Sequence, residues 1–411
     1  MMAGVERVSF ARLRADLEAL GRIGRGPGGG ITRPSFSDAD MQARRWFMGR
    51  LRDAGLEPRV DGAGNISART GDGGPAVFLG SHLDSVPNGG MFDGALGTLA
   101  ALEALRVVRE RGLRLKRPLE LVAFTDEEGA FGGFFGSYAF TGALTAEMIR
   151  AQQDVRGLRL VEVMGRHGLD AMEALRARRD PAAMHAYLEL HIEQGPILER
   201  LGVPIGIVEA ICGIRRFGVS YRGRADHAGT TPMDARKDAM VAGADLVLRA
   251  RHLGLEAAPH GRATVGIFRV EPGVANIVPE RAELILEVRE QSPAALEALA
   301  GRGTELARSV AAAWALEATI EPLLRIDPVP MHPAVQAAIA TAAGGLGLMV
   351  HCMPAGAGHD AQVMGRVARA GMVFVPCRDG RSHSPLEHAE DAACENGANV
   401  LLNAALALAN E

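Results

Sequence analysis

Two apolar runs in the first third of the chain each end abruptly in ionisable side chains. AVFLGSHL, from residue 76, ends beside His82, and LELVAFTDEEG, from residue 119, runs into Asp126, Glu127 and Glu128. Continuous apolar runs of this length are typical of strands buried on both faces of a parallel sheet. Ligands in open α/β sheets gather at the carboxyl ends of such strands. The pattern therefore predicts an α/β domain with ionisable groups at one edge of its sheet.

The chain is too long for one compact core, since cores stop growing near about 250 residues and this sequence has 411. After Gly213 the pattern changes to strand, helix, strand, strand, helix and strand, ending with ATIEPLL from residue 318. This order is typical of a ferredoxin-like unit. We therefore expect a discontinuous α/β domain with a mostly parallel sheet, residues 1–213 and 330–411, and an inserted α+β domain at 214–329.

Helical patterns surround the predicted strands. Ala and Leu recur at helical spacing from about Ala95 to Arg111, and DARKDAMVAGADLVLRARHLG, from residue 234, predicts the first helix of the insert. An amphipathic pattern within residues 1–24 predicts an ordinary first helix, and SVAAAWAL, from residue 309, lies in the insert's second helix. The chain ends in a helix that contains Leu401, Leu402 and Leu406.

Composition argues against several classes of protein. The formal net charge of -4 is close to balanced and the arginines are spread throughout, so no nucleic-acid partner is indicated. No run of about 20 apolar residues predicts a membrane span, and the start lacks a signal peptide's apolar core. The cysteines are far apart and form no CxxC pair, which favours a reducing cytoplasm over a disulfide framework or structural zinc. They are Cys212, Cys352, Cys377 and Cys394.

The segment SHLDSVPNGGMFDG offers a first set of metal-binding groups. Asp84, two residues after His82, is placed to accept a hydrogen bond from the imidazole and so to fix its tautomer. Asp93 follows in a glycine-containing turn, where one carboxylate can bridge two cations. A lone histidine at a strand end is more often an ordinary polar residue than a ligand.

Further candidates lie in three other segments. The run TDEEG would ordinarily be a solvated loop, but adjacent Glu127 and Glu128 suit a division of roles, one held on a metal and one free to move a proton. His191 in LELHIEQGPILE and His383 in SHSPLEH would each, taken alone, be a strand or surface histidine. Three imidazoles with two carboxylates form a ligand set that suits Zn, Mn, Co or Ni.

Taken together, these segments resemble the amidase, hydantoinase and carbamoylase branch of the M20 metallopeptidase superfamily. That branch includes N-carbamoyl-L-amino acid hydrolases, allantoate amidohydrolases and beta-ureidopropionases. The matching segments run in the family's order from residue 80 to 388: GSHLDSVPNGG, FDG, DEEG, LHIEQGP, ADHAGTTPM, ANIVP, GAGHDA and SHSPLEH. The resemblance implies a metallohydrolase domain and a ferredoxin-like lid through which two subunits form a homodimer.

The resemblance also implies roles for individual residues. Two divalent ions per subunit would be bridged by Asp93, and Glu127 would be the general base. His227 would donate to the oxyanion from the partner subunit, and Arg289 would hold a substrate carboxylate, unless it simply pairs with a neighbouring glutamate. The implied metal ligands are His82, Asp93, Glu128, His191 and His383, with Asp84 supporting catalysis beside them. The implied substrate contacts are Gln194, Arg215, His227, Asn276, Arg289, Gly358 and His359.

The substrate is less constrained than the metal centre. His191 stands where peptidase relatives carry a carboxylate, which favours a ureido substrate over a peptide. We expect an N-carbamoyl-L-amino acid hydrolase that releases ammonia and carbon dioxide. The alternatives are an allantoate or beta-ureidopropionate amidohydrolase, an M20-type dipeptidase, or a non-catalytic binding homologue, which would have lost ligands that are all present here. Two departures bear on substrate choice: the segment after Glu128 lacks the branch's usual arginine, and Arg216 replaces a tryptophan expected after Arg215.

Overall fold

A computed structural model describes residues 5–257 and 259–411. Residues 1–4, which begin the first predicted helical segment, and residue 258 lie outside the described residues. The chain divides into two compact units, each of which is described by itself. Unit 1 comprises the chain up to Glu209 together with residues 331–353 and 358–411, and unit 2 comprises Ala210–Pro330 with Pro354–Ala357.

The large sheet has the strand order β1-β2-β4-β3-β5-β15-β6-β13, with β14 paired to β6. Its centre, β4-β3-β5-β15, is parallel, whereas β1, β2 and β6 pair antiparallel with their neighbours. The mixed α/β fold with a mostly parallel central sheet is confirmed. The strands are β1 Arg59–Val60, β2 Ile66–Arg69, β3 Ala76–His82, β4 Leu119–Phe124, β5 Met184–Ile192, β6 Ile205–Ile211, β13 Val329–Pro330, β14 Val350–Ala355 and β15 Ala370–Val375.

Side chains along the central strands point alternately to the two faces of this sheet, and both faces are buried. Side chains such as Val77 and Leu79 of β3 join the core formed with α3 and α12, and the residues between them point to the opposite face. That opposite face carries Phe78, Tyr187 and His82, all buried. The unit 1 helices are α1 Phe10–Leu20, α2 Asp38–Asp53, α3 Ala95–Glu110, α4 Phe135–Thr141, α5 Ala146–Ala151, α6 Leu160–Arg166, α7 Ile197–Leu201, α10 Pro333–Gly345, α11 Asp360–Met364 and α12 Asp391–Ala409.

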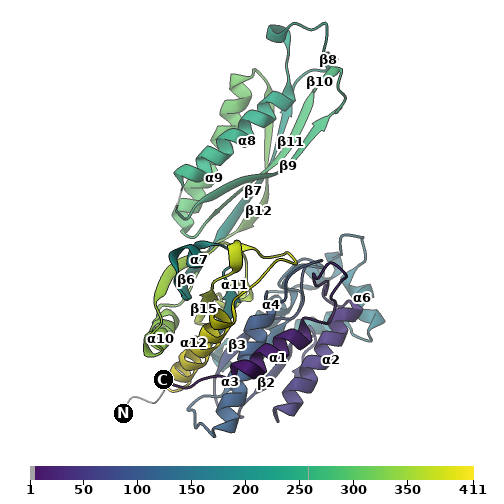
Figure 1. Ribbon diagram of the computed structural model, residues 1–411. Coiled ribbons are helices and arrows are strands. Elements are labelled where there is room, and N and C mark those ends of the chain that lie inside the picture. The colour runs from purple at the N-terminus through teal and green to yellow at the C-terminus, as the bar shows by residue number, and fades with distance from the viewer. Residues whose placement is uncertain (1–4, 258) are drawn as a thin grey trace. The chain divides into compact units, whose positions relative to one another are not determined.

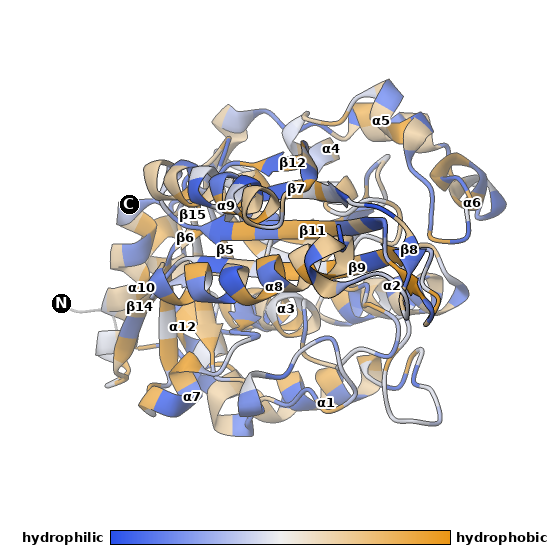
Figure 2. Cartoon of the chain, turned by 90° about the horizontal axis from the view of Figure 1, so that it is seen from above, coloured by the Kyte–Doolittle hydropathy of each residue, from blue (hydrophilic) through white to orange (hydrophobic). Residues whose placement is uncertain are grey.

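Unit 2 is an antiparallel sheet in the order β12-β7-β11-β9, with α8 and α9 packed on one side of it (Figure 1). The helices carry both hydrophilic and hydrophobic residues along their length (Figure 2), as expected where one face packs on a sheet. The expected strand and helix order is confirmed. The elements are β7 Gly213–Arg222, β8 Asp226–His227, α8 Ala239–Glu256, β9 Arg262–Glu271, β10 Ile277–Val278, β11 Arg281–Glu290, α9 Pro293–Ala313 and β12 Glu317–Ile326.

Three details differ from the sequence-based expectation. Helix α8 begins at Ala239 rather than 234, because the Asp238 side chain caps it by accepting the Met240 and Val241 N–H groups. Helix α9 ends before Trp314, and Ala315 turns the chain with a φ of 51°. Residues 354–357 belong to unit 2, where the Ala355 carbonyl accepts the Cys212 N–H at 2.9 Å. Among the described residues, no helix combines the length and the apolarity that a bilayer crossing requires.

Candidate metal centre

The register of the parallel strands brings the ionisable ends together. In the β3–β4 ladder, His82 pairs with Phe124, the last strand residue before TDEEG. In the β3–β5 ladder, Leu79 pairs with Leu188. Continued three residues further, the same register places His191 level with His82. Both histidines, with the acidic run between Thr125 and Gly129, therefore lie at the carboxyl edge of neighbouring strands.

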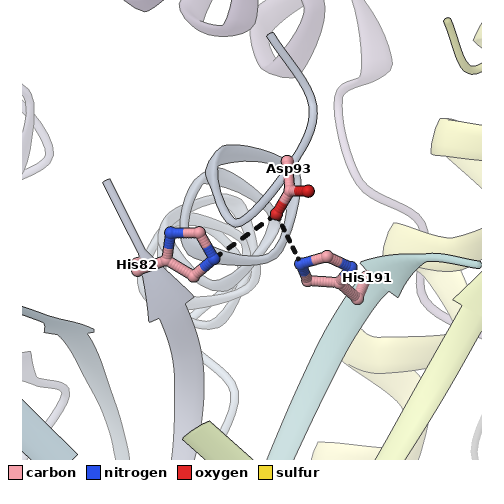
Figure 3. Close-up of side chains that lie close together, drawn as sticks. All are labelled: His82, Asp93 and His191. Carbon is pink, nitrogen blue, oxygen red and sulfur yellow. Dashed lines mark ion pairs between the residues drawn. The ribbon is translucent and has the colours of Figure 1, made fainter. Parts of the chain in front are cut away.

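His82, Asp93 and His191 form a first buried cluster (Figure 3). One oxygen of the Asp93 carboxylate, Oδ1, lies 3.5 Å from His82 Nε2 and 3.1 Å from His191 Nε2. Both imidazoles are only 1% exposed. The ligand atoms of the cluster lie within 4.8 Å of one another, close enough for one cation to bind them all.

Backbone carbonyls orient both imidazoles. His191 Nδ1 lies 2.9 Å from the Ile192 carbonyl oxygen, and His82 Nδ1 lies 3.1 Å from that of Asp84. A proton on Nδ1 bonded to a carbonyl leaves Nε2 bare, which is the form that binds a metal. We expected the Asp84 carboxylate in this role, but it lies 3.8 Å from His82 Nδ1 and instead accepts the Glu128 N–H at 3.2 Å.

The turn that carries Asp93 depends on a glycine. Gly94 has a φ of 63°, and a Cβ atom there would lie 2.3 Å from His82 Cε1. A side chain at this position would therefore displace the His82 imidazole. The glycine-containing turn predicted from the sequence thus allows the carboxylate and the histidine to approach closely.

Asp93, Glu128 and His383 form a second cluster that shares the Asp93 carboxylate. His383 Nε2 lies 3.5 Å from Asp93 Oδ2 and 3.3 Å from Glu128 Oε2. The His383 side chain is 51% exposed, whereas that of Glu128 is 7% exposed. Gln194 Nε2 donates to the same Asp93 oxygen at 2.7 Å, and Ser382 Oγ lies 2.8 Å from it. The two Asp93 oxygens thus face different clusters.

The three consecutive acids have separate environments. Both Asp126 oxygens accept the Phe131 N–H, which closes the loop, and Asp126 has a φ of 56°. Glu127 Oε2 lies 3.5 Å from His82 Nε2 but belongs to neither ligand cluster. Glu128 points to His383. Glu127 and Glu128, although adjacent in sequence, therefore have different neighbours.

The residues present fit divalent cations. Within the described part of the chain, His82 Nε2 and Glu128 Oε1 are buried without a hydrogen-bond partner. Unsatisfied buried polar atoms are costly, and a cation in each cluster would give the unpartnered residue of that cluster a partner. Imidazole and carboxylate donors suit Zn and similar first-row metals. The structure thus holds a candidate metal site that includes His82, Asp93 and His191.

The pKa values of the clustered side chains indicate that a cation must displace protons from them. Burial raises the pKa of Asp93, but the charge of His191 and hydrogen bonds from the histidines outweigh it and hold that pKa well below its usual value. Hydrogen bonds to Asp93 and Glu128 raise the pKa of His383 to about 10. Burial raises the pKa of Glu127 well above its ordinary value. A cation competes with the protons on these imidazoles, so its binding releases protons.

Glu387 is a buried carboxylate that the sequence analysis missed. Its Oε1 accepts the backbone N–H groups of Phe92 and Asp93 at 2.9 and 3.1 Å, and its Oε2 accepts the Ser382 hydroxyl at 2.8 Å. It therefore ties the Asp93 turn to the loop that carries His383. A Cβ at Gly90 would lie 2.1 Å from it. A carboxylate among Ser and Pro is ordinarily solvated, so its place in SHSPLEH is the one signal that could have pointed to it.

Gly358 and His359 border the first cluster. The His359 ring centroid lies 4.4 Å from that of His191, and a Cβ at Gly358 would lie 2.7 Å from Phe134. Burial lowers the pKa of His359 well below its ordinary value, so this imidazole is neutral. The structure thus brings His359 and Gln194, two of the expected substrate contacts, next to the clusters.

The other expected substrate contacts belong to unit 2. His227 on β8 is exposed and pairs with Ile277 on β10, beside Asn276, whose carbonyl accepts the Ala228 N–H. Arg289 bonds Glu287 at 2.8 Å and the Gly356 carbonyl at 2.7 Å, so it makes the neighbouring glutamate pair that was its ordinary interpretation. Arg215 is buried and held by ion pairs to Glu297 and Asp327, both at 2.6 Å.

Comparison with known proteins gives consistent matches. The model of peptidase family M20/M25/M40 matches residues 78–407. An N-carbamoyl-L-amino acid amidohydrolase of Geobacillus stearothermophilus is 38% identical over 97% of this chain and 98% of its own. An allantoate amidohydrolase of Bacillus subtilis is 36% identical over 94% of both chains. A solved amidase of the hydantoinase/carbamoylase family from Burkholderia multivorans superposes with a TM-score of 0.91 at 36% identity, over 98% of this chain and 99% of that one.

Proposed function

Because the chain belongs to peptidase family M20/M25/M40, we propose that it is a metal-dependent amidohydrolase that cleaves the C–N bonds of a ureido group. The substrate is an N-carbamoyl-L-amino acid, and the products are the free amino acid, ammonia and carbon dioxide. The observation that carries the proposal is the pair of ligand clusters that meet at Asp93, with Glu127 beside His82 and outside both clusters. The relatives named for this activity match nearly the full chain.

Two divalent ions, one in each cluster, fit this geometry. Asp93 presents Oδ1 to His82 and His191 and Oδ2 to His383, as a bridging carboxylate does. Zn, Mn, Co and Ni all accept such ligands, and their availability in the cell decides between them. The cysteines form no disulfide in the described part of the chain, which supports a cytoplasmic location.

Divalent ions in these clusters supply a Lewis acid that polarises the ureido carbonyl and makes water more acidic. The protein's own residues move the protons. Glu127 takes the proton from the attacking water and returns it to the departing nitrogen, because amines leave poorly without one. Burial favours the protonated form of Glu127 in the protein alone, and nearby positive charge favours the carboxylate, so this group can alternate between the two. His359 borders the reacting group from the first cluster's side, and Gln194, bonded to Asp93 Oδ2, borders it from the second cluster's side.

Unit 2 supports this chemistry as a lid and dimerisation domain. His227 Nδ1 accepts the Gly229 N–H at 3.0 Å, so the ring proton is on Nε2 and can be donated to an oxyanion. His227 acts in the active site of the partner subunit. Asn276, next to it, and Arg289 contact the substrate, and Arg289 holds its carboxylate when its bond to Glu287 is exchanged.

A panel of substrates tests the function directly. Metal-stripped enzyme is reloaded with Zn, Mn, Co or Ni, and ammonia release is measured with N-carbamoyl-L-amino acids, allantoate, β-ureidopropionate and dipeptides. We expect ammonia from the carbamoyl amino acids and none from the stripped enzyme. Faster release from allantoate would favour the activity named for the Bacillus subtilis relative. Dipeptide cleavage without turnover of any ureido compound would contradict the proposal.

A further inference from the structure

A cavity of about 580 Å³ in unit 1 borders the second ligand cluster. This volume lies within the range of small-molecule sites, about 300–1,000 Å³. Its wall includes Glu128, a candidate ligand, and Asp84, which accepts the Glu128 N–H. The cavity therefore begins at the residues that would hold a cation.

Away from Glu128, the cavity wall is largely apolar. Phe36 and Phe131 are buried side chains that line it, and their ring centroids lie 6.4 Å apart. Val163 of α6 and Val86 add aliphatic surface. Val155, also in the lining, is fully exposed at 103% of its reference area. An exposed apolar side chain at the mouth of an apolar cavity favours an apolar occupant.

Charges in the wall decide which part of a substrate fits there. The lining contains the carboxylates of Asp38, Asp84, Glu128 and Asp154. Among the described lining residues, the positive charge comes from Arg156, which already pairs with Asp154 at 2.7 Å. A substrate carboxylate would meet net negative charge in this cavity, so it must point elsewhere.

We propose that this cavity receives the side chain of the N-carbamoyl amino acid and selects bulky apolar side chains. The inference rests on the proposed function. In such a substrate, the side chain leaves the carbon next to the ureido nitrogen, so it starts close to the bond that is cleaved. A cavity that begins at Glu128 is therefore within its reach. Leucine, methionine and phenylalanine derivatives fill it, whereas allantoate would place a second polar ureido group against its aromatic wall.

A cavity-filling variant tests this assignment. Ala39 lies in the cavity lining on α2 and outside both ligand clusters, so Ala39→Phe reduces the space without removing a ligand. The values of kcat/KM are compared for N-carbamoyl-L-phenylalanine and N-carbamoylglycine. We expect the wild type to prefer the phenylalanine derivative by about tenfold or more, and the variant to lose this preference while still hydrolysing the glycine derivative. Ala337→Phe, at an exposed site on α10, is the matched control and leaves both values unchanged.

A second variant decides the question if Ala39→Phe does not fold. Val155→Asp adds a carboxylate at a fully exposed position of the lining, and it lowers kcat/KM for the phenylalanine derivative alone. Equal losses for both substrates, or a wild type that turns over N-carbamoylglycine without preferring bulky side chains, would overturn the cavity's role while leaving the proposed function intact. If the wild type releases no ammonia from any carbamoyl compound, the proposed function fails and this inference fails with it.

Discussion

In unit 1 the candidate metal ligands are fixed by the fold, whereas in unit 2 the candidate substrate contacts are held only locally. His82 and His191 are each 1% exposed, and each is oriented by a backbone carbonyl. His227 is exposed on a two-residue strand, and its imidazole accepts a hydrogen bond from Gly229 in the turn that follows. His82 and His191 are therefore preorganised, as efficient metal sites require. In our proposal, the residues of unit 2 that complete the site are buried by a substrate or a second subunit.

The elements that carry these residues explain the difference. Strands β3 and β5 are buried in the middle of a sheet, so the positions of their last residues follow from many ladder hydrogen bonds. Strands β8 and β10 pair through two residues each and join no larger sheet among the described residues. We therefore expect substitutions in the two regions to affect different quantities: metal binding and proton transfer in unit 1, and oxyanion stabilisation in unit 2.

The largest expected effect comes from Glu127→Gln. Removing the proton carrier lowers kcat by about 10²- to 10⁴-fold, while metal content stays at the wild-type level because Glu127 belongs to neither ligand cluster. Ammonia release and metal content per subunit are measured on the same sample. Glu162→Gln, on the surface of α6, is the matched control and keeps full activity. A loss of metal in Glu127→Gln would mean that this residue is a ligand rather than the base.

His227→Ala is expected to lower kcat by about 10²- to 10³-fold, the usual effect of losing one oxyanion donor. Metal content should not change in His227→Ala, whereas it should change in variants of the unit 1 metal ligands. The matched control is His252→Ala, which removes another exposed histidine of unit 2 from α8. Equal effects of His227→Ala and His252→Ala on kcat would show that His227 does not take part in the reaction.

Mixed dimers test whether His227 acts across subunits. A dimer of one His227→Ala chain and one Glu127→Gln chain contains one complete site only if the histidine and the base come from different chains. We expect partial recovery of ammonia release when the two inactive variants are mixed and dimer exchange is verified. Verified mixed dimers without activity would place His227 in the site of its own chain.

Glu387→Gln is expected to weaken metal binding by about 10- to 100-fold, the usual effect of changing a group that orients a ligand. The change removes the negative charge that accepts the Phe92 and Asp93 N–H groups and the Ser382 hydroxyl. Metal affinity is measured by competition with a chelator, and kcat at saturating metal should stay close to the wild-type value. Glu390→Gln, an exposed neighbour paired with Arg378, should leave the affinity unchanged. A Glu387→Gln enzyme with wild-type affinity would show that the turns are held without this carboxylate.

The sequence predicted those parts of the molecule that follow from local patterns. Apolar runs that end in His82 and in TDEEG predicted the buried strands and the edge at which their ends meet, because strand length and periodicity are local properties. The order of elements in unit 2 was predicted for the same reason. The place of residues 354–357 in unit 2 could not be predicted locally, because hydrogen bonds to them come from Cys212 and Arg289, far away in the chain.

The site's supporting contacts were harder to predict. Asp84 was expected to bind His82 through its carboxylate, but the backbone carbonyl takes that place, which no spacing of residue types can indicate. Glu387 was not singled out, because its burial depends on Gly90 and the Asp93 turn, almost 300 positions away. Non-glycine residues with positive φ near the clusters, Asp126, Gln194 and His383, show that tertiary contacts overrule local backbone preference there.

The smallest expected effect is on the free energy of unfolding, and it tests whether the two units unfold independently of each other. Asp238→Ala removes the side chain that caps α8 in unit 2 and should lower the free energy of unfolding by about 1 kcal/mol. Thr145→Ala removes the matching cap of α5 in unit 1, where its hydroxyl accepts the Met148 N–H. Amide hydrogen exchange should quicken in unit 2 for the first variant and in unit 1 for the second, with metal content unchanged in both. Faster exchange in unit 1 after Asp238→Ala would mean that the lid unit stabilises the ligand clusters, because the two units would then unfold together.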